Sequence, residues 1–518
     1  MWGNSWRHWG HATSPDLYTW TDHPIAIPYN DRDGSIWSGS IVVDTHNASG
    51  LFPSSSHDNI IAYYTSWTPQ QEAQAIAYSG DGGLTFKQFP HNPVISQQRH
   101  DFRDPKISFH HPSRKWVMVL TYVDAVTFFT SEDLVSWRQV SVWNPGRHLG
   151  WIECPQFLEI PVRNSRKKIV GSKWLLVLSI NGGGLNGAGA VKYMLGTFDG
   201  ERFTPEPPGA DVPESSPGLM RSGDWVAYDA DFGPDKYGTA FFHLPSNDDG
   251  EHDAISISWA IDIATSYLST PTEGEGWRHC MNGARQHWID EGSNRLMSVP
   301  AGDISSMASK QTWNPLVDLT AVAGVEGQST NIRENNPALD FLIRIRLPKN
   351  ALKDDQTATA SLKLTSTDIE DELLSLTMDF SHDESSRQTI AKFTMARQGQ
   401  RGWDKQGYWS PLEPLRPMQD SKNETAAEFE IRGVLDRSIC EVYLNGGIAA
   451  GTMLYFTQGV LDRIVLSRGL DGKSSEIEFD FRMVALVNSW ARGGEQDSGT
   501  KSSTETGGKE TMEWKIST

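Results

Sequence analysis

The amino-acid sequence predicts an all-β protein in which a β-propeller is followed by a C-terminal β-sandwich. Three observations lead to this prediction. A short turn pattern rich in Asp and Gly recurs in the first half of the chain, helical periodicity is nearly absent over residues 1–300, and strict two-residue alternation of apolar and polar side chains appears after residue 335. A set of unrelated hairpins packed as a sandwich is the alternative for residues 1–300.

The recurring pattern consists of a polar turn followed by an aromatic residue. Runs typical of β-strands flank the copies, such as residues 60–65, 116–122 and 174–180. A turn of this composition joins two antiparallel strands, and the aromatic residue after it can pack between neighbouring sheets, so each copy predicts one blade. The copies are Ser14-Pro15-Asp16-Leu17-Tyr18-Thr19-Trp20, Ser79-Gly80-Asp81-Gly82-Gly83-Leu84-Thr85-Phe86, Ser131-Glu132-Asp133-Leu134-Val135-Ser136-Trp137 and the weaker Phe198-Asp199-Gly200-Glu201-Arg202-Phe203.

The composition changes after the predicted propeller, which we place at residues 1–300. Residues 301–335 mix Ser, Asn, Thr and Gly and indicate a connector. Residues 336–490 alternate as half-buried antiparallel strands do and include the hairpin turn Asn445-Gly446-Gly447, so we expect a separate sandwich there. Residues 491–518, dominated by Gly, Ser, Thr, Lys and Glu, predict a disordered tail. The alternating apolar residues are Leu339, Phe341, Ile343, Ile345, Leu347, Ile477, Phe479, Phe481 and Met483.

Charge and cysteine usage exclude several classes of partner. The 518 residues include 46 Lys and Arg against 65 Asp and Glu, a formal net charge of −19. Such an acidic surface repels nucleic-acid phosphates and anionic lipids, so we expect no nucleic acid and no membrane as partner. The sequence as given opens without the basic and apolar segments of a signal peptide. Its 3 Cys have no metal-type spacing, which predicts neither a disulfide framework nor a zinc site.

Two acidic residues occupy positions that suit chemistry. Pro105 forces Asp104 into an extended conformation and removes a backbone donor, so the Asp104 carboxylate is expected at the mouth of a strand. A surface pair of Arg103 and Asp104 is the alternative. Glu153 is flanked by Trp, Ile and Cys, and burial among apolar groups would raise the pKa of its carboxyl into the range of a general acid. An ordinary exposed Glu before a Pro turn is the alternative there.

Aromatic and small hydroxyl residues suggest what these acids act on. Trp37 and Ser38, in Trp37-Ser38-Gly39-Ser40, could line a sugar site. Two carboxyl groups on separate strands, in a chain with 20 Trp, are what glycoside hydrolysis needs, because one protonates the leaving oxygen and the other faces the oxocarbenium charge. The combination predicts a carbohydrate substrate.

A glycine-rich segment imitates a dinucleotide-binding motif. Gly182-Gly183-Gly184-Leu185-Asn186-Gly187 follows a strand-like run, but residues 190–195 after it predict another strand and not the helix whose N-terminus would meet a pyrophosphate. The pairs His8/His11 and His110/His111 lack a third ligand at useful spacing and are interpreted as surface or packing histidines.

At these residues the sequence resembles glycoside hydrolase family 32, the invertases, inulinases and levanases that cleave β-fructofuranosides, and the fungal secreted members most of all. The resemblance covers most of the chain. It is carried, in the family's order, by Trp2-Gly3-Asn4, Trp9-Gly10-His11-Ala12-Thr13-Ser14, Trp37-Ser38-Gly39-Ser40, Asp101-Phe102-Arg103-Asp104-Pro105-Lys106, Glu153-Cys154-Pro155 and Glu441-Val442-Tyr443-Leu444-Asn445.

The resemblance implies a five-bladed propeller, a retaining β-fructofuranosidase acting on sucrose, inulin or levan, an extracellular location and no cofactor. Glu153 would be the acid/base, and Asp104 would stabilise the transition state. The substrate-binding residues would be Arg103, Trp37, Ser38, Trp2 and Asn4.

One departure from the family concerns the nucleophile. In the family, a Trp-Met-Asn-Asp-Pro-Asn-Gly motif precedes the Trp-Gly-Asn segment and supplies the nucleophilic Asp, and the sequence as given contains no such motif. We expect a propeller incomplete at its N-terminus through truncation. A natural start here, giving an inactive protein, is the other explanation. A non-catalytic fructan-binding protein and a related propeller glycosidase acting on pentosyl sugars are the alternative functions. The sequence leaves the oligomeric state open.

Overall fold

The computed structural model describes residues 7–145, 149–184, 189–209, 220–222, 224–245, 252–261, 270–272, 277–307, 338–348, 351–352, 356–366, 368–369, 371–384, 386–399, 407–411, 413–418, 426–436, 438–459, 461, 463–470, 477–486 and 512–515. Nearly every regular element among them is a β-strand, and they include no helix with the length and apolar character of a membrane span. The chain divides into two compact units. The first comprises Met1–Ala230, Tyr237–Trp259 and His287–Asn294, and the second comprises Asp231–Lys236, Ala260–Gln286 and Arg295–Thr518.

Short antiparallel strands make up the chain up to residue 300. They are β1 (Trp9–Thr13), β2 (Thr21–Ile27), β3 (Ser35–Val43), β4 (Ile60–Thr68), β5 (Gln71–Ser79), β6 (Lys87–Gln88), β7 (Ile95–Arg99), β8 (Phe102–His110), β9 (Lys115–Tyr122), β10 (Ala125–Ser131), β11 (Arg138–Trp143), β12 (Trp151–Arg163), β13 (Ile169–Asn181), β14 (Ala190–Phe198), β15 (Phe203–Pro205), β16 (Met220–Ser222), β17 (Trp225–Asp231), β18 (Tyr237–Pro245), β19 (His252–Ala260), β20 (Cys280–Met281), β21 (Arg285–Asp290) and β22 (Leu296–Pro300).

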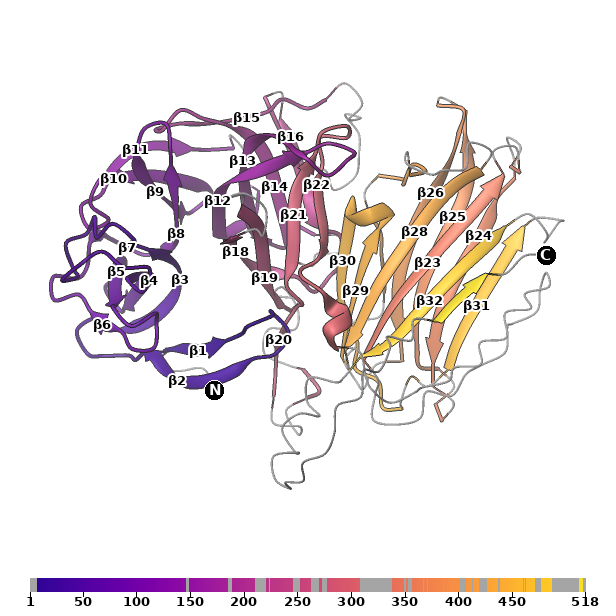
Figure 1. The fold of residues 1–518 in the computed structure, drawn as a ribbon, viewed down its shortest axis with the longest axis horizontal. Coiled ribbons are helices and arrows are strands. Elements are labelled where there is room, and N and C mark those ends of the chain that lie inside the picture. The colour runs from indigo at the N-terminus through magenta and orange to yellow at the C-terminus, as the bar shows by residue number, and fades with distance from the viewer. Residues whose placement is uncertain are drawn as a thin grey trace, which may run out of the picture. The chain divides into compact units, whose positions relative to one another are not determined.

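Neighbours in sequence pair to form the blades of the first unit (Figure 1). β3, β4, β5 and β6 pair in chain order, and so do β8 to β11 and β12 to β15. The repeated turns lie between β1 and β2, β5 and β6, β10 and β11, and β14 and β15. They form because the Asp carboxylates accept backbone N–H groups: Asp81 from Thr85, and Asp133 from Ser136. The predicted strand–turn–strand repeat is therefore confirmed, whereas the number of five blades stays a prediction.

Some strands of the first unit, among them β4, β5 and β10, are buried on both faces because one blade packs against the next. β10 is buried along its whole length, as expected for a strand covered on both sides. Trp137, which follows one of the repeated turns, meets Tyr63 of β4 edge-on, with ring centroids 5.8 Å apart. The predicted packing of turn aromatics between sheets is thus confirmed at this position. β14, which follows the glycine-rich segment, is a strand as predicted; residues 185–188 lie outside the described residues.

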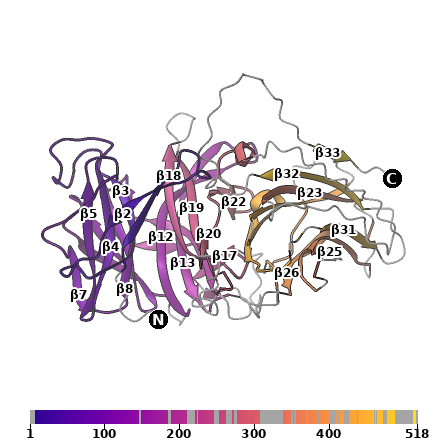
Figure 2. The same ribbon diagram turned by 90° about the horizontal axis from the view of Figure 1, so that it is seen from below.

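Two sheets form the second unit, and Figure 2 shows them as two layers. One sheet has the order β30-β29-β28-β23-β32-β33, and the other has the order β27-β26-β25-β24-β31. The elements are η3 (Ile304–Met307), β23 (Ala338–Pro348), β24 (Ala358–Thr365), β25 (Leu373–Asp383), β26 (Gln388–Gln398), β27 (Gly407–Trp409), β28 (Ala426–Asp436), β29 (Ile439–Leu444), η4 (Asn445–Gly447), β30 (Ala449–Leu454), β31 (Arg463–Leu470), β32 (Glu478–Leu486) and β33 (Met512–Lys515).

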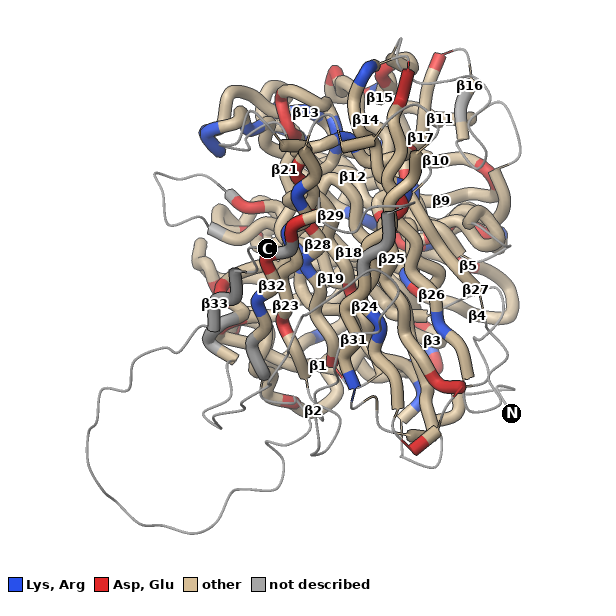
Figure 3. The backbone as a smooth tube through the Cα atoms, turned by 90° about the vertical axis from the view of Figure 1, so that its right-hand side faces the viewer, with Lys and Arg blue, Asp and Glu red and all other residues tan. Residues whose placement is uncertain are grey.

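The predicted alternation in the second unit is confirmed in β23. In β23 the apolar residues point into the core between the sheets, and the charged residues between them lie on the other face. There Arg344 pairs with Glu430 at 3.0 Å and Arg346 with Glu428 at 2.9 Å. Figure 3 shows the basic and acidic residues of these strands interspersed, not separated by sign. This face is therefore polar without carrying a strong field of one sign.

Two of the predicted segments lie mostly outside the described residues. Of the predicted connector at 301–335, the structure describes residues 301–307, which contain η3. Of the predicted tail at 491–518, it describes residues 512–515, which form β33 and pair with β32. The hairpin turn at Asn445 is confirmed, because η4 joins β29 to β30 with Gly446 and Gly447 at φ of +70° and +101°, which glycine adopts readily.

Candidate active site

Four adjacent strands of the first unit share one irregularity. β8 lies beside β3 and β12, and β12 lies beside β18. Each of these strands breaks its antiparallel register near one end, and such bulges redirect side chains out of the regular ladder. The breaks fall between Ile36 and Gly39, Arg103 and Lys106, Glu153 and Gln156, and Tyr237 and Ala240. The candidate residues predicted from sequence on β3, β8 and β12 all lie at these breaks.

Arg103 connects the acidic residues of the site. Its Nη1 donates to Glu72 Oε2 at 3.0 Å and to Asp101 Oδ1 at 3.2 Å, and its Nη2 donates to Glu153 Oε1 at 3.2 Å. Burial opposes the charged form, but the surrounding carboxylates, Glu72 first, raise the pKa of Arg103 above its ordinary value. The guanidinium is therefore a fixed positive charge that holds side chains from β5, β8 and β12 together.

Asp104 is buried, and its φ of +64° in the backbone break of β8 shows that the extended conformation expected before Pro105 was wrong. Its backbone N–H donates to Thr65 Oγ1 at 2.9 Å, and its Oδ2 accepts the backbone N–H of Cys154 at 2.8 Å. Burial and the nearby Glu153 carboxylate raise the pKa of Asp104 to about 6, although the Cys154 N–H and Arg103 act in the opposite direction. Asp104 is thus part of a buried cluster and not of the surface pair considered as the alternative.

Glu153 has polar contacts where the sequence suggested apolar ones. Its side chain is 25% exposed, and its Oε2 accepts the hydroxyl of Tyr237 at 2.8 Å. Arg103 binds the other carboxylate oxygen. The expectation that Glu153 lies among apolar groups was wrong, because Ile152 on the same strand points to the opposite face and enters the core.

The other sequence-predicted residues are distributed differently. Trp37 and Ser38 lie in the break of β3, and Trp37 stacks on Trp67 with ring centroids 5.7 Å apart and planes 6° apart. Ser40 accepts the backbone N–H of Ile107 at 3.1 Å, which joins β3 to β8. Trp2 and Asn4 lie outside the described residues.

Two members of the cluster were not predicted from the sequence. Glu72 is buried near the start of β5, and Tyr237 is the first residue of β18, 84 positions after Glu153. Burial and the Glu153 carboxylate raise the pKa of Tyr237, so its hydroxyl stays a donor. Gly238, with φ of +54°, marks the same break, and a lone glycine within a strand is the pattern that could have pointed to Tyr237.

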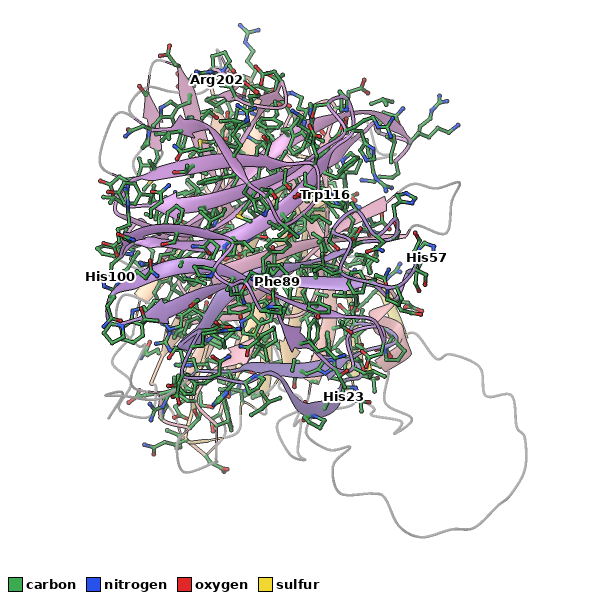
Figure 4. All side chains as sticks on the ribbon, turned by 90° about the vertical axis from the view of Figure 1, so that its left-hand side faces the viewer. His23, His57, Phe89, His100, Trp116 and Arg202 are labelled. Atoms are coloured by element: carbon green, nitrogen blue, oxygen red, sulfur yellow. The ribbon has the colours of Figure 1, made fainter. Side chains whose placement is uncertain are left out.

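Among the described residues, the cysteine and histidine side chains form neither a disulfide nor a metal site. All three cysteines are free. Cys154 contacts Asp104, and burial raises the pKa of its thiol well above the ordinary value. Within the described ranges no group of three His, Cys, Asp or Glu side chains has metal-binding geometry, and Figure 4 shows His23, His57 and His100 well apart. His110 packs against Trp174 and Phe198.

Comparisons with known proteins relate both parts of the chain to one family. The sequence model described as Glycosyl hydrolases family 32 N-terminal domain matches residues 1–300, and the one described as Glycosyl hydrolases family 32 C terminal matches residues 307–483. The extracellular exo-inulinase of Meyerozyma guilliermondii is 30% identical over 479 residues, which are 89% of this chain and 82% of that relative. Invertase 2 of Saccharomyces cerevisiae is 28% identical over 499 residues, 93% of this chain and 87% of the relative.

A solved structure extends the likeness to the fold. The fructofuranosidase from Schwanniomyces occidentalis complexed with fructose has a TM-score of 0.71 and 26% identity, covering 93% of this chain and 90% of that chain. Both domains of this protein therefore have counterparts in known structures, as a propeller and a sandwich. Two family models together match nearly the whole chain, and the chain belongs to glycosyl hydrolase family 32.

Proposed function

We propose that this protein is an extracellular β-fructofuranosidase that hydrolyses sucrose or fructans, with Glu153 as the acid/base and Asp104 as the stabiliser of the transition state. The observation that carries the proposal is the Arg103 guanidinium, which holds the partly exposed Glu153 beside the buried Asp104. Support for the substrate class comes from the relatives, which are named as an exo-inulinase and an invertase, and from the neighbour that binds fructose.

The chemistry follows from the different surroundings of the two acids. Glu153 is reachable by solvent, so it can give a proton to the glycosidic oxygen and later take one from water. Asp104 is held by a backbone N–H and lies in a buried setting, where a negative charge interacts strongly with the positive charge that develops on the fructosyl ring. Arg103 orients the acid/base, and Tyr237 fixes its second oxygen. Trp37 and Ser38 are proposed to line the fructosyl site.

Replacement of the acid/base tests the proposal. In an expressed protein that also carries the family's nucleophile motif, Glu153→Gln keeps the shape of the side chain and removes the proton, so we expect fructose release from sucrose or inulin to fall by about 10²- to 10⁴-fold. Thermal unfolding should be little changed. Glu132→Gln is the matched control, because its side chain is 81% exposed in an ordinary surface pair with Lys115. Full activity of the Glu153→Gln variant would exclude Glu153 as the acid/base. Inulin binding by calorimetry without fructose release from the unchanged protein would instead support a binding function.

A further inference from the structure

A large aromatic side chain lies exposed beside the candidate acid/base. Trp151 is 51% exposed although it begins a strand whose next residue, Ile152, is buried at 2%. Sequence reasoning treated this tryptophan as part of an apolar surrounding for Glu153. The structure places it in contact with solvent, and its exposure is not explained by core packing.

The indole of Trp151 is held in place by the cluster that holds Glu153. Trp151 and Glu153 are two residues apart in a regular stretch of β12, so their side chains leave the same face of the strand. The Arg103 guanidinium that binds Glu153 also lies over the Trp151 ring, 5.5 Å from its centroid. A cation within about 6 Å of an aromatic centroid is attracted to the face of the ring. Arg103 therefore lies over one face of the indole, and about half of the Trp151 surface remains exposed to solvent.

The exposed fraction increases from Asp104 through Glu153 to Trp151. Asp104 is 7% exposed, the Glu153 side chain 25% and Trp151 51%. If the fructosyl ring contacts the buried Asp104, the glycosidic oxygen meets Glu153, and the group beyond that oxygen continues toward solvent. The side chain on that outward path, on the same strand face as Glu153, is Trp151.

We infer that Trp151 binds the saccharide on the leaving-group side of the scissile bond, by packing the exposed part of its indole against the apolar C–H face of that sugar. The inference rests on the proposed function. A rigid aromatic surface with few rotatable bonds loses little conformational entropy on binding, which suits a ring-shaped ligand. Trp151 thereby determines how well the protein distinguishes a substrate with a sugar leaving group from free fructose, which fills only the inner position.

Calorimetry on variants that bind but do not turn over tests this assignment. In the Glu153→Gln background, Trp151→Ala should weaken sucrose binding by about three- to tenfold, the value of one aromatic contact. Fructose binding should change by less than twofold. Trp151→Phe, which keeps a smaller aromatic face, should restore most of the sucrose affinity. Trp20→Ala is the matched control, because Trp20 is exposed to a similar degree, 48%, and precedes β2.

The outcomes separate this inference from the proposed function. Loss of sucrose affinity with fructose affinity retained, and rescue by Phe, supports the assignment. Equal weakening for both sugars places Trp151 at the fructosyl position, and an effect no larger than that of Trp20→Ala removes Trp151 from the site. Each of these two results overturns the inference while leaving the proposed function intact. If neither sugar binds before Trp151 is changed, both the proposed function and the inference fail.

Discussion

Each unit of the protein contains a buried arginine surrounded by carboxylates, and the two clusters differ in how completely they are closed. Arg285 of the second unit is fully buried, donating to Asp231 Oδ2 at 2.7 Å and, through Nη2, to both Glu441 Oε1 and Thr452 Oγ1 at 2.6 Å. Arg103 of the first unit also binds several carboxylates, but one of its partners, Glu153, is a quarter exposed.

This difference separates a structural ion cluster from one that can do chemistry. In the Arg285 cluster the charged groups are hydrogen-bonded to one another away from water, and they join the segments 231–236, 282–286 and 441–452 of the second unit. In the Arg103 cluster, Asp104 carries a raised pKa and the Glu153 side chain is partly exposed to solvent. The two clusters contain similar residue types and differ in whether water reaches one of their carboxylates.

The largest effect on stability is expected from opening the closed cluster. Arg285→Ala leaves Asp231 and Glu441 buried without their positive partner, which should lower the free energy of unfolding by about 3–5 kcal/mol. Urea unfolding measures the change. Arg344→Ala, which removes a partly exposed pair with Glu430, is the control and should cost less than about 1 kcal/mol.

If the Arg285→Ala variant does not fold, Arg285→Lys gives a second measurement. It keeps the charge but not the planar fork of donors, so its loss of stability should lie between the loss for Arg344→Ala and the loss expected for Arg285→Ala. A loss for Arg285→Lys no larger than that for Arg344→Ala would show that the closed cluster is not a major structural element.

A smaller effect, and one that depends on pH, is expected from Asp104. Its folded-state pKa of about 6 lies above the ordinary value of 3.8, so its contribution to stability is fully present below pH 4 and is lost as the pH rises through 6. The Asn side chain of the Asp104→Asn variant does not ionise, so this variant does not lose that stability as the pH rises. At pH 7 the variant should therefore be more stable than the wild type by about 1–3 kcal/mol, and near pH 4 the two should be alike.

Unfolding curves at several pH values measure this difference. Asp16→Asn serves as the control, because hydrogen bonds from Thr19 lower the pKa of this exposed carboxyl, and its pH dependence should have the opposite sign. A stability difference for Asp104→Asn that is independent of pH would contradict the raised pKa.

The smallest effect is expected from Tyr237, which touches the open cluster through one hydrogen bond. Tyr237→Phe removes the donor to Glu153 Oε2, and water can partly replace it because Glu153 is accessible to solvent. We expect kcat for sucrose to fall about tenfold, the value of one hydrogen bond to a charged group, with KM changed by less than about twofold. Tyr78→Phe on β5 is the control. A change in KM alone would place Tyr237 in substrate binding and not in positioning the acid/base.

The strands that were predicted best are those in which alternate residues face opposite sides of the sheet, so that a residue's place in the strand tells whether its side chain is buried. In β23 the residues Leu339 to Leu347 alternate because one face meets the core and the other meets water, and this period of two is written in the sequence. The repeated turns were equally readable, since Asp81 and Asp133 bond to N–H groups a few residues away. Both features depend on local geometry.

The surroundings of Glu153 could not be predicted from local sequence patterns. Its neighbours in sequence, Ile152 and Cys154, suggested an apolar setting, but its contacts in space are Arg103 and Tyr237, 50 positions before it and 84 after it. Glu72 likewise lies in a strand with other polar residues, such as Gln71 and Gln74, and nothing near it in the sequence indicates its role. Which side chains meet at a bulge depends on how neighbouring blades pack.

The amino-acid sequence by itself determined the class of fold, the order of the two domains and the positions of the acidic motifs at Asp104 and Glu153, because strand period, turn chemistry and motif residues act over short distances along the chain. The tertiary structure alone decided that Arg103 binds Glu72 and Glu153 together, that Asp104 is buried with a raised pKa, and that Trp151 faces solvent. These properties arise from desolvation and from charges on separate strands, and both are set only when the blades come together.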